Sequence, residues 1–316
     1  MRHLKLLVII LFLLPLSPAV AHQDPEIAGY INVDGGRIWY RLNGAEHIGK
    51  APAIIVMHGG PGGIHRTNMP YVALADAYPV ILYDQLGTGN SDRPNNPENW
   101  TVERFVAEID HIRAALNLKD VIIAGHSWGG TLAAEYAARR PDGLKAAILS
   151  SPLISTAQWI ADNQVWIDQL PPNVSYTLRK HIAEGTQDHP DYKAAEEVFY
   201  SKHMCRQNPC PGRDYWTGAS EWNKNMYVHM WGSSDFYATG TLKDYDGSGK
   251  LHDIAVPTLM ICGEFDEAAP KSCHKYANMI PQSQTVIVPN AGHATMAENE
   301  EFYLKSLADF LAKLPE

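Results

Sequence analysis

Short apolar runs and longer amphipathic segments alternate along the chain. A hairpin pattern comes first, at 28–44, where an Asp-Gly-Gly turn separates two strand-like stretches. Six apolar runs follow, and most of them end in a loop rich in glycine, proline or acidic residues. These runs lie at 51–63, 78–91, 120–130, 145–153, 256–267 and 284–293. Segments with helical periodicity lie at 101–117, 131–143, 271–281 and 301–314.

This alternation predicts an α/β fold, with a mostly parallel central sheet and helices on both faces. Residues 155–250 break the pattern, since they are rich in tryptophan, tyrosine, proline and charged residues and contain helix-like pieces such as 191–204. We interpret them as an inserted, mainly helical cap domain. The core domain then comprises 22–154 and 251–316, with edges defined to within several residues.

The first 21 residues have the pattern of an export signal. Arg2 and Lys5 give a short basic start, an apolar stretch follows at 6–16, and 19–21 matches an A-x-A cleavage site. A membrane anchor is the alternative, but the apolar stretch is short for a bilayer and prolines interrupt it. We therefore expect a cleaved signal peptide at 1–21 and a periplasmic or secreted protein, with no membrane contact after cleavage.

Charge and cysteine content narrow the functional classes. The formal net charge is −9, and loss of the signal peptide makes the remaining chain more acidic, which argues against nucleic acid or an anionic membrane as the partner. Cys205 and Cys210 are close enough in sequence to close a small disulfide loop, with buried free thiols as the alternative. Whether Cys262 and Cys273 pair stays open. None of the cysteine spacings is typical of a metal site.

A serine stands between small residues where a predicted strand turns into a helix. Residues 125–130 read Gly-His-Ser-Trp-Gly-Gly, which contains the G-x-S-x-G pattern of a nucleophile elbow. So tight a turn requires small neighbours. It would hold Ser127 beside the N-terminus of the following helix, where developing negative charge is stabilised. A plain N-cap serine is the alternative interpretation.

A serine nucleophile needs a base, and the base needs an orienting carboxylate. In a fold of this kind the expected order along the chain is serine, acid, histidine. Asp266 and His293 follow the last two predicted strands, so we predict them as the partners of Ser127. Glu264 and Glu267 are alternatives for the acid.

Acyl transfer also requires two backbone N–H donors that stabilise the oxyanion. We predict that one comes from Trp128, which follows the serine, and the other from Gly60 in the glycine-rich loop 58–63. Gly59 is the alternative, whereas Pro61 has no N–H to donate.

Two histidines near these motifs are expected to be structural. His58 opens the glycine-rich loop and is expected to brace it. His126 precedes the serine, so we expect it to pack beneath the turn and to face away from the reacting groups.

Five segments, in this order along the chain, resemble the α/β-hydrolase superfamily and in particular the proline iminopeptidase-like serine peptidases. They are 58–63, 83–94, 125–130, 263–270 and 291–298, and together they span nearly the whole chain after residue 21. The resemblance implies an α/β-hydrolase fold with a helical cap. It also implies that residues 84–85 and 87–91 form the loop beside the oxyanion hole.

The cap carries a further resemblance at 230–246. In such iminopeptidases an acidic residue of this segment, usually glutamate, helps to hold the free α-amino group of the substrate, and Asp235 falls at that place here. A buried ammonium needs carboxylate partners. For a second carboxylate we consider Glu197 and Glu221, and also Glu196, with a solvated helix face as the alternative for each. Candidates for the walls of an apolar pocket, or for packing within the cap, are Trp216, Trp222, Tyr227 and Trp231.

The predicted function is that of an exported serine aminopeptidase that releases N-terminal residues, with proline as one candidate, from short peptides through an acyl-enzyme. The same apparatus would serve an amino-acid amidase, an esterase or a lactonase, because specificity resides in the cap. A non-catalytic ligand-binding protein is a remote alternative. The expected partner is a small peptide, amide or ester. The sequence implies no metal or organic cofactor and does not define an oligomeric state.

Overall fold

The computed structural model describes residues 24–211 and 221–315, so the predicted signal peptide and Trp216 lie outside the described residues. Eight strands form one sheet in the order β1-β2-β4-β3-β5-β6-β7-β8. The strands β1 and β2 pair antiparallel and form the predicted hairpin, and β2 also pairs antiparallel with β4. All other neighbouring strands run parallel. The strands are β1 (Ile27–Val33), β2 (Gly36–Asn43), β3 (Ala53–Met57), β4 (Val80–Asp84), β5 (Val121–His126), β6 (Leu144–Ser150), β7 (Thr258–Gly263) and β8 (Ser283–Val288).

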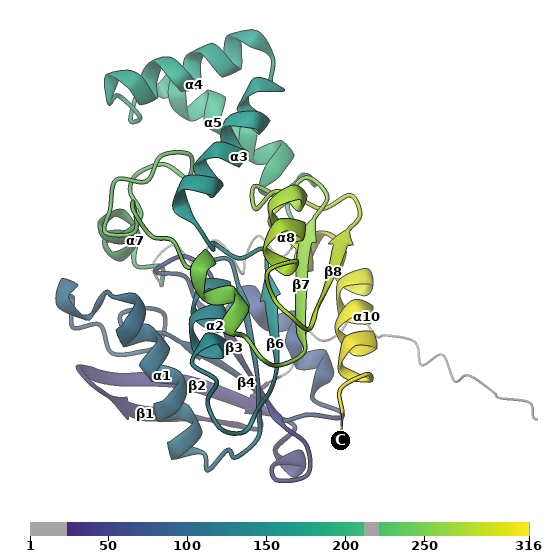
Figure 1. Cartoon of the computed structure of the whole chain (residues 1–316). Helices are drawn as coiled ribbons and strands as arrows, with labels where there is room; N and C mark the ends of the chain where they lie inside the picture. The colour runs from purple at the N-terminus through teal and green to yellow at the C-terminus, as the bar shows by residue number, and fades with distance from the viewer. Residues whose placement is uncertain (1–23, 212–220, 316) are drawn as a thin grey trace, which may run out of the picture.

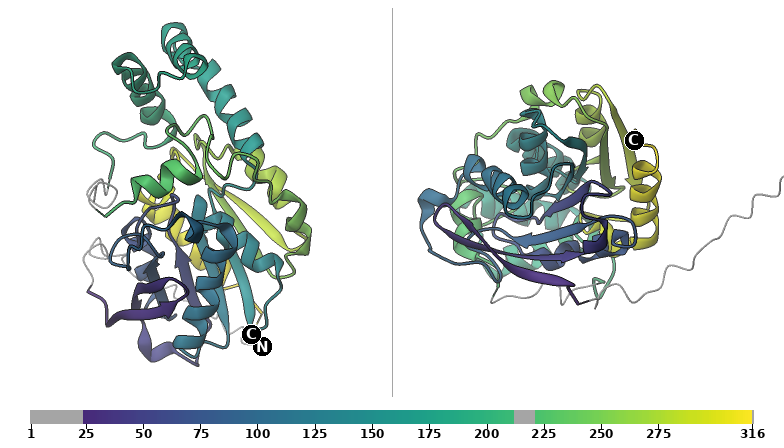
Figure 2. Two further views of the ribbon diagram at one scale, coloured as in Figure 1. Left: turned by 90° about the vertical axis from the view of Figure 1, so that its left-hand side faces the viewer. Right: turned by 90° about the horizontal axis from the view of Figure 1, so that it is seen from below.

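Helices cover both faces of this sheet (Figures 1 and 2). On one face lie α1 (Val102–Ala115), α2 (Trp128–Ala138) and α8 (Pro270–Ala277). On the other lie the 3-10 helix η3 (His65–Leu74) and α10 (Glu300–Leu311). The short helix α9 (Thr295–Glu298) precedes α10. The predicted α/β fold is therefore confirmed.

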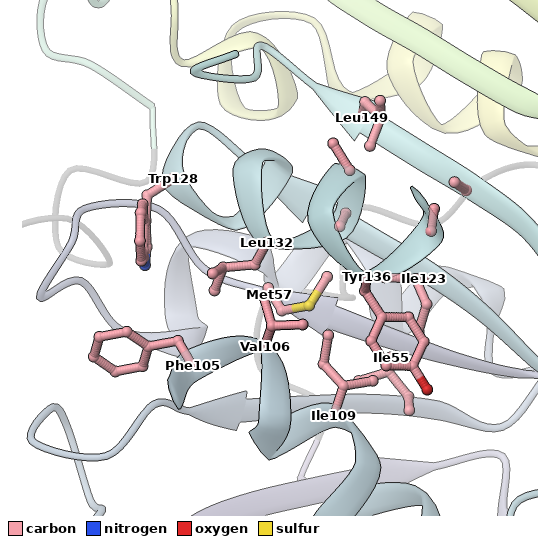
Figure 3. Packing of buried hydrophobic residues seen from close by; sticks show 14 of the residues in the cluster. Ile55, Met57, Phe105, Val106, Ile109, Ile123, Trp128, Leu132, Tyr136 and Leu149 are labelled. Atoms are coloured by element: carbon pink, nitrogen blue, oxygen red, sulfur yellow. The ribbon is translucent and has the colours of Figure 1, made fainter. Parts of the chain in front are cut away.

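The central strands are buried at almost every position and mostly apolar, because each of their faces meets a layer of helices. Successive side chains of a strand point to opposite faces. Ile55 and Met57 of β3 accordingly belong to the cluster that contains Phe105 of α1 and Leu132 of α2 (Figure 3). The side chain of Ile54 points to the opposite face and packs with residues of η3 and α10 instead. This double burial fixes the strand ends that carry the candidate catalytic loops.

The helix α2 begins at Trp128, earlier than the segment 131–143 predicted from periodicity. Two glycines in its first turn, Gly129 and Gly130, look like loop residues in the sequence. In the structure a Cβ on Gly129 would overlap the carbonyl oxygen of Met57, so tertiary contact requires glycine there despite its low helix propensity.

The segment between β6 and β7 is mainly helical, as predicted. It contains α3 (Thr156–Asp168), α4 (Pro172–Glu184), α5 (Pro190–His203) and α7 (Lys224–Met230). Figure 1 shows α3, α4 and α5 beyond the ends of β6 and β7. These helices share a small apolar core of their own, which includes Ile167, Leu178, Phe199 and Phe236.

All four cysteines are paired. Cys205 and Cys210 close the short loop after α5, and Cys262 of β7 is joined to Cys273 of α8. The second bridge ties the strand that leads into the loop of Asp266 to the helix that follows this loop. Within 24–211 and 221–315, no helix has the length and apolar character needed to cross a membrane.

Candidate active site

The predicted nucleophile stands on a strained turn between β5 and α2. Ser127 has φ 56° and ψ −119°, a backbone conformation that non-glycine residues rarely adopt. Such strain costs about 1–3 kcal/mol and persists only where the surroundings enforce it. A Cβ on Gly125 would overlap the carbonyl of Gly129 across this turn. The small residues around the serine are therefore required by the geometry, as the sequence predicted.

Asp266 and His293 meet after the ends of β7 and β8. Nδ1 of His293 lies 2.7 Å from Oδ1 of Asp266. Three further donors hold the same carboxylate: the backbone N–H groups of Ala268 (2.8 Å) and Gly263 (3.0 Å) and the hydroxyl of Ser151 (2.5 Å). A carboxylate with four donors is fixed in place. It thereby orients the imidazole with Nδ1 protonated and Nε2 toward the cavity.

Glu267, next to Asp266, faces the other nitrogen of the same imidazole. Its Oε1 lies 3.7 Å from Nε2 of His293, within ion-pair range but beyond a hydrogen bond. Burial alone would lower the pKa of His293, but the carboxylates of Asp266 and Glu267 outweigh this effect and raise the pKa to about 9. The imidazole is thus held between two carboxylates.

The carboxylates of Asp266 and Glu267 differ in how many hydrogen bonds their oxygens accept. Both side chains are buried, but Oε2 of Glu267 has no hydrogen-bond partner among the described residues. Burial raises the pKa of the Glu267 carboxyl well above its usual range, an effect that the charge of His293 opposes. A buried carboxylate with an unused oxygen is costly unless a cation joins it.

The alternative assignments for the acid do not fit this geometry. Glu264 is exposed and accepts a hydrogen bond from the backbone N–H of Asn290. Glu267 approaches Nε2, the nitrogen needed for the serine, whereas Asp266 holds Nδ1. Of the three acidic residues, Asp266 alone is placed to orient the base.

The glycine-rich loop after β3 is braced as predicted. Nδ1 of His58 lies 2.8 Å from the carbonyl oxygen of Gly59, and Nε2 accepts the backbone N–H of Gln85 at 3.1 Å. Burial lowers the pKa of His58 to about 4, so the ring is neutral, as this hydrogen-bond pattern requires. The indole of Trp128 donates to the side-chain oxygen of Gln85 (2.9 Å). The loop after β4 therefore connects the two segments that are predicted to supply the oxyanion donors.

One cavity of about 300 Å³ joins these groups to the cap. Ser127, His293 and Glu267 lie in its wall together with Gly59 and Gly60 of the glycine-rich loop. The side chain of Trp128 is fully buried and does not line it, so its predicted role rests on the backbone N–H at the start of α2. Apolar cap and core side chains that also line the cavity are Leu153, Trp159, Met204, Trp222 and Trp231.

Asp235 lines the same cavity from the cap and is held by two tyrosines. The hydroxyl of Tyr200 donates to Oδ2 at 2.6 Å, and the hydroxyl of Tyr227 donates to Oδ1. Burial, followed by the charge of Asp235, raises the pKa of both phenols well above the usual range, so they remain donors. The shorter aspartate side chain is thus fixed in position by one hydroxyl on each oxygen.

Of the other acidic residues considered, Glu197 and Glu221 do not line the cavity. Glu197 is exposed on α5, and Glu221 forms an ion pair with Arg66. Glu196 does line it, but Lys193 lies 2.9 Å away and compensates its charge. The other acidic side chain in the cavity wall is that of Glu267. Its signal in the sequence is a second acidic residue directly after the predicted catalytic one, in a segment with no basic neighbour.

His126 was expected to pack beneath the turn and to face away from the reacting groups, and the second half of this expectation is wrong. Its ring is buried, but it also lines the cavity and lies 4.6 Å from the ring of His293, centroid to centroid. The left-handed backbone of Ser127 turns the chain so sharply that neighbouring side chains reach the same cavity. Burial and the nearby His293 lower the pKa of His126 well below its usual value, so it adds no positive charge.

One group in the described part of the chain has ligand atoms close enough together for a metal ion. His181, His189 and Asp191, on and beside the cap helices α4 and α5, place these atoms within 4.8 Å of one another. The two imidazoles stack at an interplanar angle of 19°, so their lone pairs do not converge. None of the three lines the cavity of Ser127.

Comparison with known proteins agrees with this fold. Residues 52–300 match the family model described as "alpha/beta hydrolase fold". The chain therefore belongs to the α/β-hydrolase family. It is 40% identical over 283 residues to a proline iminopeptidase of Heyndrickxia coagulans, a match that covers 90% of this chain and 98% of the relative. With such relatives, it is a proline iminopeptidase-like serine hydrolase.

Two solved structures resemble the whole fold. A proline iminopeptidase of Mycobacterium smegmatis is 33% identical, with a TM-score of 0.83 and coverage of 91% of this chain and 98% of that protein. The protein VinJ is 34% identical, with a TM-score of 0.86 and coverage of 92% and 100%. The similarity therefore includes the cap as well as the sheet.

Proposed function

We propose that this protein is an exported serine aminopeptidase that releases N-terminal residues, with proline as the preferred one, from short peptides. The observation that carries the proposal is the position of Glu267, 3.7 Å from Nε2 of His293. In an aminopeptidase the α-nitrogen is only two bonds from the carbonyl carbon that is attacked. A carboxylate that binds this nitrogen must therefore lie beside the catalytic base, as Glu267 does.

The proposed reaction uses Ser127, His293 and Asp266 as a triad. Nε2 of His293 takes the hydroxyl proton as Oγ of Ser127 attacks the carbonyl carbon. The backbone N–H groups of Gly60 and Trp128 stabilise the oxyanion. His293 then gives the proton to the leaving amine, which breaks the peptide bond and leaves the aminoacyl group on Ser127. Water, deprotonated by the same imidazole, hydrolyses this ester and regenerates the serine.

Asp235 and Glu267 are proposed to hold the α-ammonium from two sides. Both line the cavity of Ser127, one from the cap and one from the core. Charge-assisted hydrogen bonds to two fixed carboxylates define the orientation as well as the position of the nitrogen. A prolyl ammonium has two N–H donors, so two carboxylates satisfy it completely.

The preference for proline is supported by the relatives and by the walls of the cavity. The chain shares 40% of aligned residues with a proline iminopeptidase. Trp159, Trp222 and Trp231 line the cavity around the carboxylates. Flat aromatic walls suit a compact apolar ring, because they bury its carbon atoms without requiring side-chain hydrogen bonds.

Export is proposed from the N-terminal pattern and is supported by the cysteines. Residues 1–21 combine a basic start, an apolar core and an A-x-A site. Four paired cysteines suit an oxidising compartment, since disulfides are rare in reducing ones. Expression of the full chain in a bacterial host should yield a periplasmic protein whose N-terminus is His22. A protein that keeps Met1 and remains in the cytoplasm would refute this part of the proposal.

The activity is tested with the 2-naphthylamides of proline, alanine and phenylalanine, each with a free and an N-acetylated amine, beside a simple acetate ester. We expect the free-amine compounds to be cleaved, proline fastest, and the acetylated ones to be inert. A fluorophosphonate should label Ser127 in the same preparation. Equal cleavage of free and acetylated compounds would identify a general amidase or esterase instead.

A further inference from the structure

Glu267 has a second consequence for the reaction, because it contacts the atom that must accept the serine proton. A general base works only when its nitrogen carries a lone pair. The Oε1–Nε2 contact of 3.7 Å favours a proton on Nε2. The base required for acyl transfer is therefore blocked by the carboxylate that is proposed to bind the substrate.

We propose that Glu267 keeps His293 protonated while the cavity is empty, and that the ammonium group of the substrate frees the base by taking over this carboxylate. The inference rests on the proposed function, since it assumes that Glu267 binds the α-ammonium. It makes Glu267 a positioning residue that couples recognition of the amine to activation of the nucleophile.

The surroundings of His293 support this exchange of one cation for another. Acidic groups face the imidazole from two directions: Asp266 and Glu267 from the loop after β7, and Asp235 from the cap. His126 on β5 is the other titratable group against the ring, and it is neutral. Trp159 of α3 covers a further side without charge. The imidazolium is thus the counterion that the described residues place beside Glu267.

The protonation directions agree with this geometry. Burial favours the neutral imidazole, but Asp266 and Glu267 outweigh it and raise the pKa of His293 to about 9. Burial also raises the pKa of Glu267, but the charge of the nearby imidazolium opposes this effect, so the proton of the pair is retained on Nε2 at neutral pH. When an ammonium binds to Glu267, the imidazolium loses its partner and releases the Nε2 proton to bulk water. Nε2 can then accept the proton of the Ser127 hydroxyl.

The exchange would discriminate against uncharged substrates at the chemical step as well as in binding. A neutral ester can enter the cavity, but it brings no cation and leaves the proton on His293. Its hydrolysis should therefore increase as pH rises through about 9, where the imidazole becomes neutral. A substrate with a free amine should react at neutral pH, because binding itself lowers the pKa of the base.

The test compares Glu267→Gln with the wild type on 4-nitrophenyl acetate, which has no amine, across a range of pH. Loss of the Glu267 charge should shift the midpoint of the pH dependence of kcat/KM for this ester downward by about one pH unit or more. At neutral pH the variant should then cleave this ester about tenfold faster, since one unit changes the neutral fraction tenfold. Cleavage of prolyl-naphthylamide should decrease in the same variant. An unchanged midpoint, or a decrease on both substrates, would overturn the proposal.

Asp235→Asn is the comparison variant. It removes a carboxylate from the proposed ammonium site but not the one 3.7 Å from Nε2, so it should impair the free-amine substrate and lower the ester midpoint less than Glu267→Gln does. If neither variant impairs the free-amine substrate, the proposed amine site is wrong. The pH midpoint of ester hydrolysis by Glu267→Gln still tests separately whether Glu267 keeps His293 protonated.

A calorimetric measurement avoids any variant of Glu267. Prolinamide is titrated into Ser127→Ala at about pH 6.5, where both the free amine and His293 are protonated. In buffers with different ionisation enthalpies, the observed heat should reveal release of a proton for each ligand bound. Binding without proton release would contradict the exchange.

Discussion

On the core side of the cavity, Ser127, Asp266 and His293 stand just beyond the ends of β5, β7 and β8, whereas on the cap side Asp235 is held by the hydroxyls of Tyr200 and Tyr227. The core groups owe their positions to the sheet and to backbone hydrogen bonds in the adjoining loops. The cap group owes its position to side chains from two helical segments. Glu267 belongs to the core by sequence and faces the cavity with the cap group.

The two sides of the cavity differ in how completely their carboxylates are hydrogen-bonded. Four donors fix Asp266, so its charge is compensated before any substrate arrives. Glu267 keeps one oxygen without a partner among the described residues, and Asp235 has donors that leave room for an ionic partner. The carboxylate of Asp266 is thus fully hydrogen-bonded, whereas the carboxylates of Glu267 and Asp235 are the ones proposed to bind a cation. Variants on the two walls should therefore fail in different ways.

The largest effect is expected from Ser127→Ala on the core wall. Removal of the nucleophile should lower kcat for prolyl-naphthylamide by about 10⁵- to 10⁶-fold, because no acyl-enzyme can form. Because the carboxylates are untouched, the variant should still bind prolinamide in calorimetry. Retained turnover in a preparation free of contaminating host peptidases would disprove the assignment of the nucleophile.

Asp266→Asn should be the next most damaging change. An amide at this position would favour the wrong tautomer of His293 while keeping the size of the side chain, and kcat should decrease by about 10⁴-fold. Steady-state kinetics on prolyl-naphthylamide measures the loss, and Glu264→Gln is the matched control because Glu264 is exposed. If both variants lose activity equally, Asp266 does not have the orienting role.

Asp235→Ala tests the carboxylate on the cap side of the cavity. Loss of one charged hydrogen bond to the ammonium should raise KM for prolyl-naphthylamide by about 10- to 150-fold, with a smaller change in kcat. The rate of 4-nitrophenyl acetate hydrolysis should change little, because that substrate has no amine. An equal loss on both substrates would mean that Asp235 supports the fold of the cap and not amine recognition.

Tyr200→Phe should have the smallest effect. It removes one donor from Asp235, at 2.6 Å, while the Tyr227 hydroxyl still holds the other oxygen. A single hydrogen bond of this kind contributes about 0.5–1.5 kcal/mol, which corresponds to a rise in KM of about 2- to 12-fold. Tyr176→Phe, on an exposed side chain of α4, is the control and should leave KM unchanged.

The core side of the site could be predicted from the sequence because its signals are local. Ser127 lies in a pentapeptide whose glycines are required by the turn, and Asp266 and His293 lie in the loops that follow β7 and β8. Parallel strands bring their carboxyl ends to one edge of the sheet, so residues far apart in the chain meet there. Fold and triad geometry thus follow from short patterns in a fixed order.

The acidic residues that line the cavity toward the cap could not be predicted as fully from the sequence. Glu197 and Glu221 looked as suitable as any other acidic residue, because helix orientation in the cap depends on packing between distant segments. From the sequence, Glu267 is only an alternative to Asp266, because the sequence does not show which ring nitrogen a carboxylate will face. The bridge between Cys262 and Cys273 likewise depends on how α8 packs against β7.

The most direct measurement compares prolyl-naphthylamide with the naphthylamide of cyclopentanecarboxylic acid, which replaces the ring nitrogen by carbon and keeps the shape. If Asp235 and Glu267 recognise the ammonium, kcat/KM at neutral pH should be about 10²- to 10⁴-fold higher for the prolyl compound, the contribution of two charged hydrogen bonds. Comparable values for the two compounds would contradict the account, because shape alone would then select the substrate.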